Sequence, residues 1–457
     1  MNSPDSRHRR LWLHRTSRIP VAPPIAPTLA LVWAALVCAA PFPDRAAAAV
    51  DTTAAVAGLR HFAHACALDG GALWGRSLYG PVALVDRATR LTIANRADSA
   101  RAWSALDDAF IGQLPAGIGL ANTSFDFGGA RWAMVLLPLP VDDFALVALL
   151  AHESFHRIQR DLSLWGAGPP CPHLDTRDGR LWLRLELRAL VVAVRARGDG
   201  AARATRDALT FRRQRQRLFP GADSLESQLE IQEGLAEYTG DKLALAATGL
   251  SVERVARDME RFEKRASYVR SMAYGSGPGL GLLLDRYAAG WRRQLTRDSR
   301  LAEMLARALR VTPPADLEAE ARRRAGAYGL VEVEREENVR ERERQARASD
   351  YRARLVEGPT LTLRAGNINF SFDPNSLVPL GDLGTAYPTG TFMAAWGKIE
   401  VESGGALVGP DFTSLAVPAP SDTSVRPVRG PGWRLELAPG WSVRTRSDRP
   451  GSYEVTR

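Results

Sequence analysis

Two histidines and a glutamate form the part of the sequence best suited to chemistry. The string His152-Glu153-Ser154-Phe155-His156 places two imidazoles four residues apart. On a helix such residues lie one turn apart on one face, so both can bind one metal ion, while Glu153 projects beside them toward a metal-bound water. A chance match anywhere in a chain of this composition has a probability of roughly 1%. The string therefore predicts a metal site with a general base; a hydrogen-bonded structural cluster is the alternative.

A catalytic zinc ion needs a third protein ligand besides two histidines, with water in the fourth position. Downstream, residues 231–238 read Ile-Gln-Glu-Gly-Leu-Ala-Glu-Tyr. Here the sequence resembles the gluzincin metallopeptidases, whose ligand helix carries Asn-Glu-Gly-Phe-Ala or a close variant. The resemblance implies that Glu233 is the third ligand, although Gln232 replaces the usual Asn. It also implies that Glu237, one turn later, orients His152 or His156 by accepting a hydrogen bond.

A tyrosine motif supports the same resemblance. Tyr274-Gly275-Ser276-Gly277 is similar to the Tyr-x-x-Gly of the aminopeptidase branch, where the phenol stabilises the oxyanion. Tyr274 is thus the expected oxyanion donor. An ordinary core role for Tyr274 remains open, with Tyr268 as the competing donor.

The chain departs from that family in two places. The segment between His156 and Glu233 is far longer than in the familiar aminopeptidases, so Glu186 and His173 remain rival ligands. In addition, residues 128–134 lack the Gly-x-Met-Glu-Asn whose glutamate binds a substrate amine. Aminopeptidase specificity is therefore not supported.

The elements around the histidines can be read from the apolar pattern. Residues 130–137 predict a buried strand that, as a sheet edge, could hold an extended peptide. Asp142 or Asp143 then caps a helix that runs to about Arg160. This helix is apolar nearly all round over residues 144–151, so it belongs in the middle of a core.

The segments before and after this helix give weaker signals. Before it we expect a helix over residues 54–67, a hairpin over 80–95 and a helix over 100–111. After it, two helices with arginines on their outer faces are expected over 179–196 and 201–218. Asp223 and Glu226 form a capping-box pattern ahead of the helix that contains residues 231–239, and two more helices follow before Leu309.

The last third of the chain changes character twice. Residues 313–355 are highly charged, which favours a solvated helical linker over a partner-binding coil. From residue 356 onward, short alternating runs at 360–364, 368–372, 398–401 and 433–437 predict an all-β domain. The fold class expected is α+β: a mainly helical zincin-like catalytic domain with a small N-terminal sheet at 50–312, the linker at 313–355 and the β-domain at 356–457.

The N-terminus reads as a targeting signal over residues 1–49. A basic start precedes an apolar run at 29–40, too short to span a bilayer, and then small residues at 46–49. We therefore expect a soluble periplasmic or secreted protein, with no stable membrane insertion after cleavage; Arg9-Arg10 leaves a twin-arginine route open. In an oxidising compartment, Cys66 and Cys171 are expected to form a disulfide, with two separate buried thiols as the alternative.

Composition bounds the class of protein and its partners. The 457 residues are 45% hydrophobic and 24% charged, as in ordinary globular proteins. The net charge of +9 comes from scattered arginines without a basic stripe, so a nucleic-acid partner is not expected.

These features together predict an exported zinc metallopeptidase with one zinc ion per chain and a peptide or protein substrate. The alternative from another class is a cell-envelope binding protein on a catalytically inactive zincin scaffold, in which the β-domain does the binding. Glu153 speaks against that alternative, because a protein that only binds metal does not require a general base.

Overall fold

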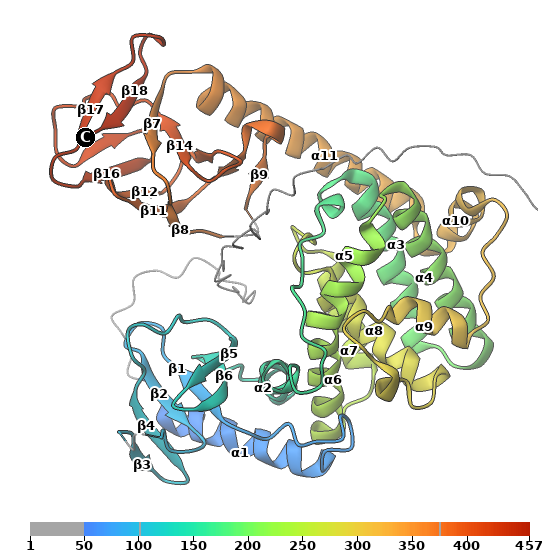
Figure 1. The fold of residues 1–457 in the computed structure, drawn as a ribbon. Helices are drawn as coiled ribbons and strands as arrows, with labels where there is room; N and C mark the ends of the chain where they lie inside the picture. Colours follow the sequence, from blue (N-terminus) through green and yellow to red (C-terminus); the bar gives the residue numbers. More distant parts are fainter. Residues whose placement is uncertain (1–49, 100–101, 374–375) are drawn as a thin grey trace, which may run out of the picture.

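The computed structural model describes residues 50–99, 102–373 and 376–457. The predicted signal peptide, residues 1–49, lies outside the described residues. The chain has the expected α+β composition, with a helical region and a C-terminal β region, and a small sheet precedes the helices (Figure 1).

The N-terminal part consists of α1 (Thr52–Asp69) and a six-stranded mixed sheet. Its strands lie in the order β3-β4-β2-β1-β6-β5, with β1 and β6 parallel and every other neighbour antiparallel. The strands are β1 (Val82–Val85), β2 (Leu91–Ala94), β3 (Ser104–Leu106), β4 (Ala109–Gln113), β5 (Thr123–Phe127) and β6 (Ala130–Leu136). The hairpin expected over residues 80–95 and the strand expected over 130–137 are confirmed.

Two expectations for this sheet are wrong. Where a helix is predicted over residues 100–111, of which 100 and 101 lie outside the described residues, the chain forms the β3–β4 hairpin, because Asp107 adopts a left-handed backbone (φ 50°) that turns the chain. Pairing of Ile111 with Ile93 then joins the hairpin to β2. The second error concerns residues 130–137, which are expected to form a sheet edge. They form β6, which lies between β1 and β5, so β5 is the edge strand on this side of the sheet.

The helix that carries both histidines is α2 (Asp143–Ile158), as the sequence predicts. The Asp142 side chain caps it by accepting a hydrogen bond from the Ala145 amide at 2.8 Å. Figure 1 shows α2 between the N-terminal sheet and the helical region, in contact with β5, β6 and α6. A Cβ on Gly240 of α6 would lie 2.5 Å from the Ala148 carbonyl oxygen, so only glycine permits this close crossing.

The helical region continues from the loop after α2 to the start of the β region. Its elements are η1 (Pro172–Asp175), α3 (Arg177–Arg195), α4 (Gly198–Leu218), α5 (Ala222–Leu229), η2 (Glu230–Gly234), α6 (Leu235–Thr248), α7 (Glu253–Glu263), α8 (Met272–Tyr287), η3 (Trp291–Gln294), α9 (Leu301–Ala308), α10 (Leu317–Ala325), η4 (Gly326–Tyr328), α11 (Leu330–Arg352) and η5 (Ala353–Glu357). The helices expected over 179–196 and 201–218 are confirmed as α3 and α4. The capping box is wrong: α5 starts after Gly221 without a side-chain cap, and Glu226 turns into the core.

The charged helices are less solvated than their sequences suggest. Arg180 and Arg184 of α3 are 1% and 6% exposed, not on an outer face as expected. Both guanidinium groups bind Glu337 of α11, at 2.6 and 3.1 Å. The charged segment is helical as predicted, but α11 packs on α3 through these ion pairs. Mutual neutralisation allows two polar faces to become buried together.

The β region contains two sheets. One has the strand order β17-β18-β7-β14-β13-β10-β9 and the other β15-β16-β12-β11-β8. The elements are β7 (Thr360–Arg364), β8 (Asn369–Ser371), β9 (Val378–Pro379), η6 (Gly381–Leu383), β10 (Thr385–Tyr387), β11 (Gly390–Ala394), β12 (Gly397–Val401), β13 (Ala406–Val408), β14 (Ser414–Pro418), β15 (Val428–Gly430), β16 (Trp433–Leu437), β17 (Ser442–Thr445) and β18 (Tyr453–Thr456). Buried side chains from both sheets, among them Phe392 and Leu415, form with Trp396 of the β11–β12 turn a core separate from that of the helices. The β character expected from residue 356 onward is confirmed.

The two cysteines do not form the expected disulfide. Cys66 and Cys171 are free and buried, and they belong to different hydrophobic clusters. Cys66 lies on α1, whereas the Cys171 backbone amide donates to the Val269 carbonyl at 2.6 Å, and its side chain belongs to a cluster with Met272 and Ala273 of α8. Burial raises the pKa of the Cys66 thiol to about 12, as expected of an unreactive core thiol.

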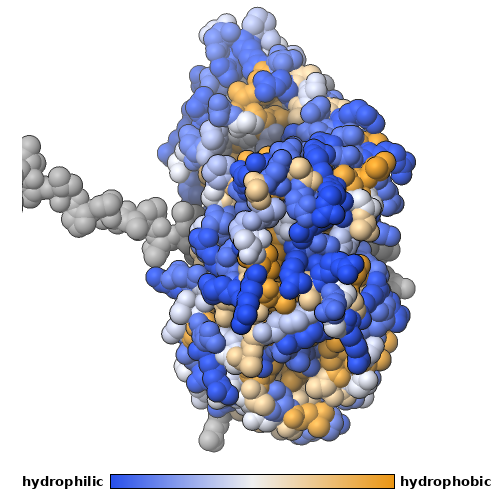
Figure 2. All heavy atoms as spheres, turned by 90° about the vertical axis from the view of Figure 1, so that its right-hand side faces the viewer, coloured by the Kyte–Doolittle hydropathy of each residue, from blue (hydrophilic) through white to orange (hydrophobic). Residues whose placement is uncertain are grey.

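The face drawn in Figure 2 is mostly hydrophilic, with apolar residues in small scattered groups. Within the part of the chain that the structure describes, every helix is too short or too polar to cross a bilayer.

Candidate metal centre

Three buried side chains bring their ligand atoms together between α2 and η2. His152 Nε2 and His156 Nε2 lie 3.1 Å apart, and Glu233 Oε2 lies 3.5 and 3.4 Å from them. The three residues are 5%, 7% and 6% exposed. Among the described residues they are the one group of three or more such side chains whose geometry could hold a metal ion.

A local change in helical winding presents Glu233 to the histidines. Residues 230–234 form a π-helical turn, in which the Leu235 amide binds the Glu230 carbonyl. Such turns insert one residue into a helix and occur often at functional sites. A Cβ on Gly234 would lie only 3.2 Å from Gly277 Cα of α8, so the two glycines let this turn and α8 approach each other closely.

The carboxylate of Glu237 fixes the protonation of His152. Its Oε2 lies 2.9 Å from His152 Nδ1. A carboxylate only accepts hydrogen bonds, so Nδ1 carries the proton and the lone pair of Nε2 faces Glu233. This contact is the one that the gluzincin resemblance implies for Glu237.

Gln159 does the same for His156, a role that the sequence does not predict. Its Nε2 donates to the carbonyls of Ile231 and Gln232 at 2.9 and 3.1 Å, which fixes the orientation of the amide. Its Oε1 therefore faces His156 Nδ1 at 3.0 Å and accepts the proton there. The only sequence signal is a polar residue three positions after the second histidine on an otherwise buried helix.

The donor set fits a tetrahedral metal ion. Metal bonds of about 2.0–2.1 Å to nitrogen and oxygen give a tetrahedron with edges of about 3.4 Å, and the three ligand separations are 3.1, 3.4 and 3.5 Å. Two imidazole lone pairs and a carboxylate oxygen point toward one another. These groups repel unless a cation lies among them.

The pKa shifts of the three ligand side chains also indicate that this site attracts positive charge. Burial lowers the pKa of His152 and His156, but the contacts with Glu233 outweigh burial and the pKa of both histidines is raised. Burial raises the pKa of Glu233, yet the two histidines hold it well below its usual range. The pocket therefore stabilises a cation, either a proton or a metal ion.

Glu153 is buried beside this group without belonging to it. The residue is 2% exposed, and its Oε2 has no hydrogen-bond partner. Burial raises its pKa, and the nearby histidines oppose that shift. A buried carboxylate oxygen without a partner is rare in a native protein and calls for an explanation. A water molecule or substrate that Glu153 serves would provide one.

Tyr274, at the start of α8, reaches the centre, whereas Tyr268 does not. The Tyr274 hydroxyl donates to Glu233 Oε2 at 2.6 Å, and its ring stacks on His152 with centroids 5.5 Å apart. The Tyr268 hydroxyl instead binds the backbone carbonyl of Glu263. Of the two tyrosines considered from the sequence, only Tyr274 lies where it could contact a reacting group.

The rival ligands Glu186 and His173 lie in a different cluster. Glu186 forms ion pairs with Arg212 and Arg215 at 2.6 and 2.7 Å. His173 Nε2 lies 2.8 Å from Glu226. Both side chains are thus occupied within the protein, and neither approaches the two α2 histidines as Glu233 does.

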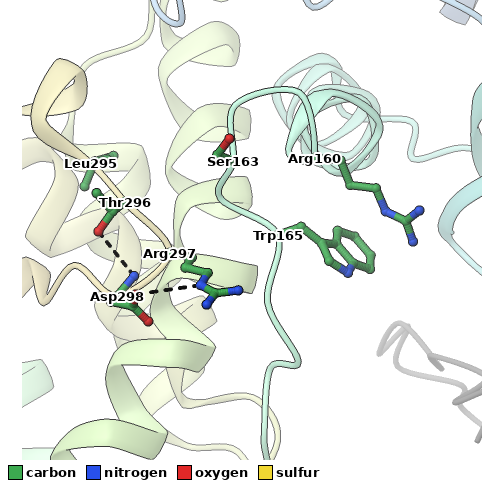
Figure 3. A pocket seen from close by; sticks show the side chains of 7 residues that line it. All are labelled: Arg160, Ser163, Trp165, Leu295, Thr296, Arg297 and Asp298. Carbon is green, nitrogen blue, oxygen red and sulfur yellow. Dashed lines mark hydrogen bonds and ion pairs between the residues drawn. The ribbon is translucent and has the colours of Figure 1, made fainter. Parts of the chain in front are cut away.

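A shallow cavity lies beyond the C-terminal end of α2. It has a volume of about 520 Å³ and is lined by Arg160, Ser163, Trp165, Leu295, Thr296, Arg297 and Asp298 (Figure 3). The Gly166 amide donates to Gln232 Oε1 at 3.1 Å, so the loop that forms one wall is attached to the segment that carries Glu233. The metal ligands do not line the cavity. Three of its lining residues, Arg160, Ser163 and Trp165, follow the ligand His156 closely in the sequence.

No family model, curated protein or solved structure matches this chain. The function is therefore inferred from the donor atoms, their protonation and their surroundings. These features distinguish the group of His152, His156 and Glu233 from the other buried charges of the chain.

Proposed function

We propose that this protein is an exported zinc-dependent metallopeptidase of gluzincin type. One observation carries the proposal: three buried ligand atoms converge without a cation of the chain among them, beside a buried carboxylate oxygen that has no partner. Two histidines and one glutamate form a ligand set of catalytic zinc sites. When bound, zinc would lower the pKa of a water molecule and polarise the substrate carbonyl.

The chain's own residues would divide the remaining work. His152, His156 and Glu233 would hold one zinc ion per chain, with Glu237 and Gln159 fixing the two imidazoles. Glu153 would take the proton from the attacking water and later deliver it to the leaving amine.

Tyr274 would donate its hydroxyl to the oxyanion of the tetrahedral intermediate. Its present partner, Glu233 Oε2, is a ligand atom. The hydroxyl must therefore turn from Glu233 toward the substrate when the metal and the peptide are in place.

The edge strand β5 would hold the substrate. It pairs only with β6, and it contacts α2. A peptide in extended conformation could add to this edge by backbone hydrogen bonds and so lie across the metal centre.

Hydrolysis of an unbiased peptide library by wild type and Glu153→Gln tests the proposal. Replacing the Glu153 carboxylate by an amide removes the proton acceptor and leaves the three metal ligands intact. Hydrolysis should therefore fall at least about a hundredfold. Zinc content, measured on the same samples, should remain near the wild-type level. Glu318→Gln, at an exposed surface ion pair, is the matched control and should keep full activity.

Equal hydrolysis by wild type and Glu153→Gln, at matched zinc content, would contradict the proposal. The activity would then belong to another site or to a contaminant. In that case the binding-protein alternative would be preferred.

A further inference from the structure

Arg160 and Trp165 form a cluster one helical turn beyond the histidines. Arg160 follows His156 by four residues, in the turn after α2; because Gln159 keeps a helical backbone, Arg160 begins about 6 Å beyond His156. Its guanidinium lies over the Trp165 ring, 4.8 Å from the centroid, and Arg131 of β6 lies 5.6 Å from the same centroid. Figure 3 shows the side chains of Arg160 and Trp165 extending to the same side of their loop.

Only part of the positive charge of this cluster is neutralised by carboxylates of the described residues. Within the described residues, Arg160 has no carboxylate partner and its contact is with the Trp165 ring. Arg131 binds the exposed Asp126, but its buried Nε has no hydrogen-bond partner. Arg297, on the opposite wall of the cavity, pairs with Asp298. Arg160 therefore supplies the unpaired charge next to the cavity.

The cluster is held in a fixed relation to the metal centre. The Gly166 amide, one residue after Trp165, donates to Gln232 Oε1 at 3.1 Å. Gln159, one residue before Arg160, donates to the Gln232 carbonyl. Both ends of the turn are thus joined to the residue that precedes the ligand Glu233.

The cluster also lies beside the edge strand. Asp126 of β5 pairs in register with Arg131 of β6. A side chain of a peptide bound along β5 would therefore come near Arg131, which contacts the same Trp165 ring as Arg160.

We propose that Arg160, Arg131 and Trp165 form a specificity subsite for a carboxylate of the substrate, an inference that rests on the proposed peptidase function. A guanidinium presents two parallel N–H donors that match a carboxylate. The Trp165 ring holds the guanidinium in place through a cation–π contact. The carboxylate belongs either to an acidic side chain or to the C-terminus of the peptide.

Two peptide series distinguish these sources. In the first, peptides blocked at both ends carry a single Glu or Gln at each position in turn; in the second, unmodified peptides end in a free acid or an amide. Wild type should show kcat/KM about tenfold higher for the carboxylate member at one position or at the C-terminus. Arg160→Ala should abolish the preference, and Arg160→Glu should favour Lys at that position. Arg342→Ala, an exposed arginine of α11, is the control and should behave as wild type.

Binding provides a second readout that does not need turnover. Calorimetry with the zinc-loaded Glu153→Gln protein should give about tenfold tighter binding of the preferred acid than of its amide partner, and Arg160→Ala in that background should remove the difference. Equal kcat/KM and equal affinity for acid and amide in both series would overturn the subsite and leave the peptidase intact. Absence of any hydrolysis, with the affinity difference still present, would count against the peptidase and for carboxylate recognition.

Discussion

Two buried charged clusters lie on consecutive turns of one segment, and they differ in where their positive charge comes from. Glu226 and Glu230 face what we call the arginine network, which also contains Glu186, Arg212 and Arg215. Glu233, on the next turn, faces the two histidines of α2. A buried carboxylate therefore indicates a metal-binding side chain only where no guanidinium already neutralises its charge.

Each carboxylate of the arginine network has a guanidinium partner from the chain itself. Arg212 binds Glu186 and Glu230 at 2.6 and 2.5 Å, and Arg215 binds Glu226 at 2.6 Å. Burial lowers the pKa of Arg212, but Glu186 and Glu230 outweigh it and the pKa is raised. Charges that are paired and hydrogen-bonded in this way stabilise each other without a ligand.

The metal centre contains no such cation. Its three converging atoms are all bases, and Glu237 and Gln159 occupy the opposite nitrogens of both imidazoles. Helix α8 touches both clusters: Ser276 Oγ donates to Glu230 at 2.6 Å and Tyr274 donates to Glu233. The comparison predicts that the network serves folding and that the centre serves binding.

The largest effect is expected from Arg212→Met, which should destabilise the fold by about 3–5 kcal/mol because it leaves the buried Glu230 carboxylate without a guanidinium and Glu186 with Arg215 alone. Urea unfolding followed by tryptophan fluorescence measures it. Arg217→Met, at an exposed ion pair with Glu318, is the control on the same helix and should cost less than about 1 kcal/mol. Similar losses for both variants would remove the distinction between network and surface.

A smaller effect is expected from Glu237→Gln. The carboxylate that binds His152 Nδ1 is lost, so zinc affinity should fall about 10- to 100-fold while unfolding in the absence of metal changes little. Competition with a chromophoric chelator measures the affinity. Glu260→Gln on α7 is the control. An unchanged affinity would mean that Glu237 does not support the metal centre.

The smallest effect concerns pH and the ion pairs between α11 and α3. Burial raises the pKa of Glu341, but its bonds to Arg344 and Arg180 outweigh burial and lower the pKa to about 2. A lowered carboxyl pKa stabilises the fold above the unfolded-state value of about 4.5 and ceases to do so as the pH falls toward 2. The stability difference between wild type and Glu341→Gln should therefore be constant above about pH 5 and shrink below it.

Denaturant unfolding at several pH values measures this difference. Glu343→Gln, two residues along the same helix, is the control and should show a flat, near-zero difference. A gap for Glu341→Gln that stays constant from neutral pH to pH 3, or grows, would contradict the assignment of stability to this carboxylate.

The sequence was most informative where one local pattern decides the outcome. The string from His152 to His156, the apolar strand before it and the cap at Asp142 depend on short-range spacing, and the structure has all three elements. The gluzincin resemblance implies Glu233 as the third ligand, and the structure brings its carboxylate to both histidines.

Expectations failed where distant partners decide. Charge predicts outer faces for the arginines of α3 and α4, yet carboxylates from other helices allow several of them to be buried. The pattern over residues 100–111 favours a helix locally, but pairing of β4 with β2 makes strands of its described part. The π-helical turn and the role of Gln159 depend on contacts between separate helices, which no single segment encodes.

Metal analysis of the purified mature protein tests the central claim most directly. Wild type should contain about one zinc ion per chain, because three protein ligands and a water complete a four-coordinate site. Glu233→Ala should lose the zinc, whereas Glu186→Gln, in the arginine network, should retain it. Full zinc in Glu233→Ala together with loss in Glu186→Gln, or a wild-type protein that binds no zinc, would contradict the account.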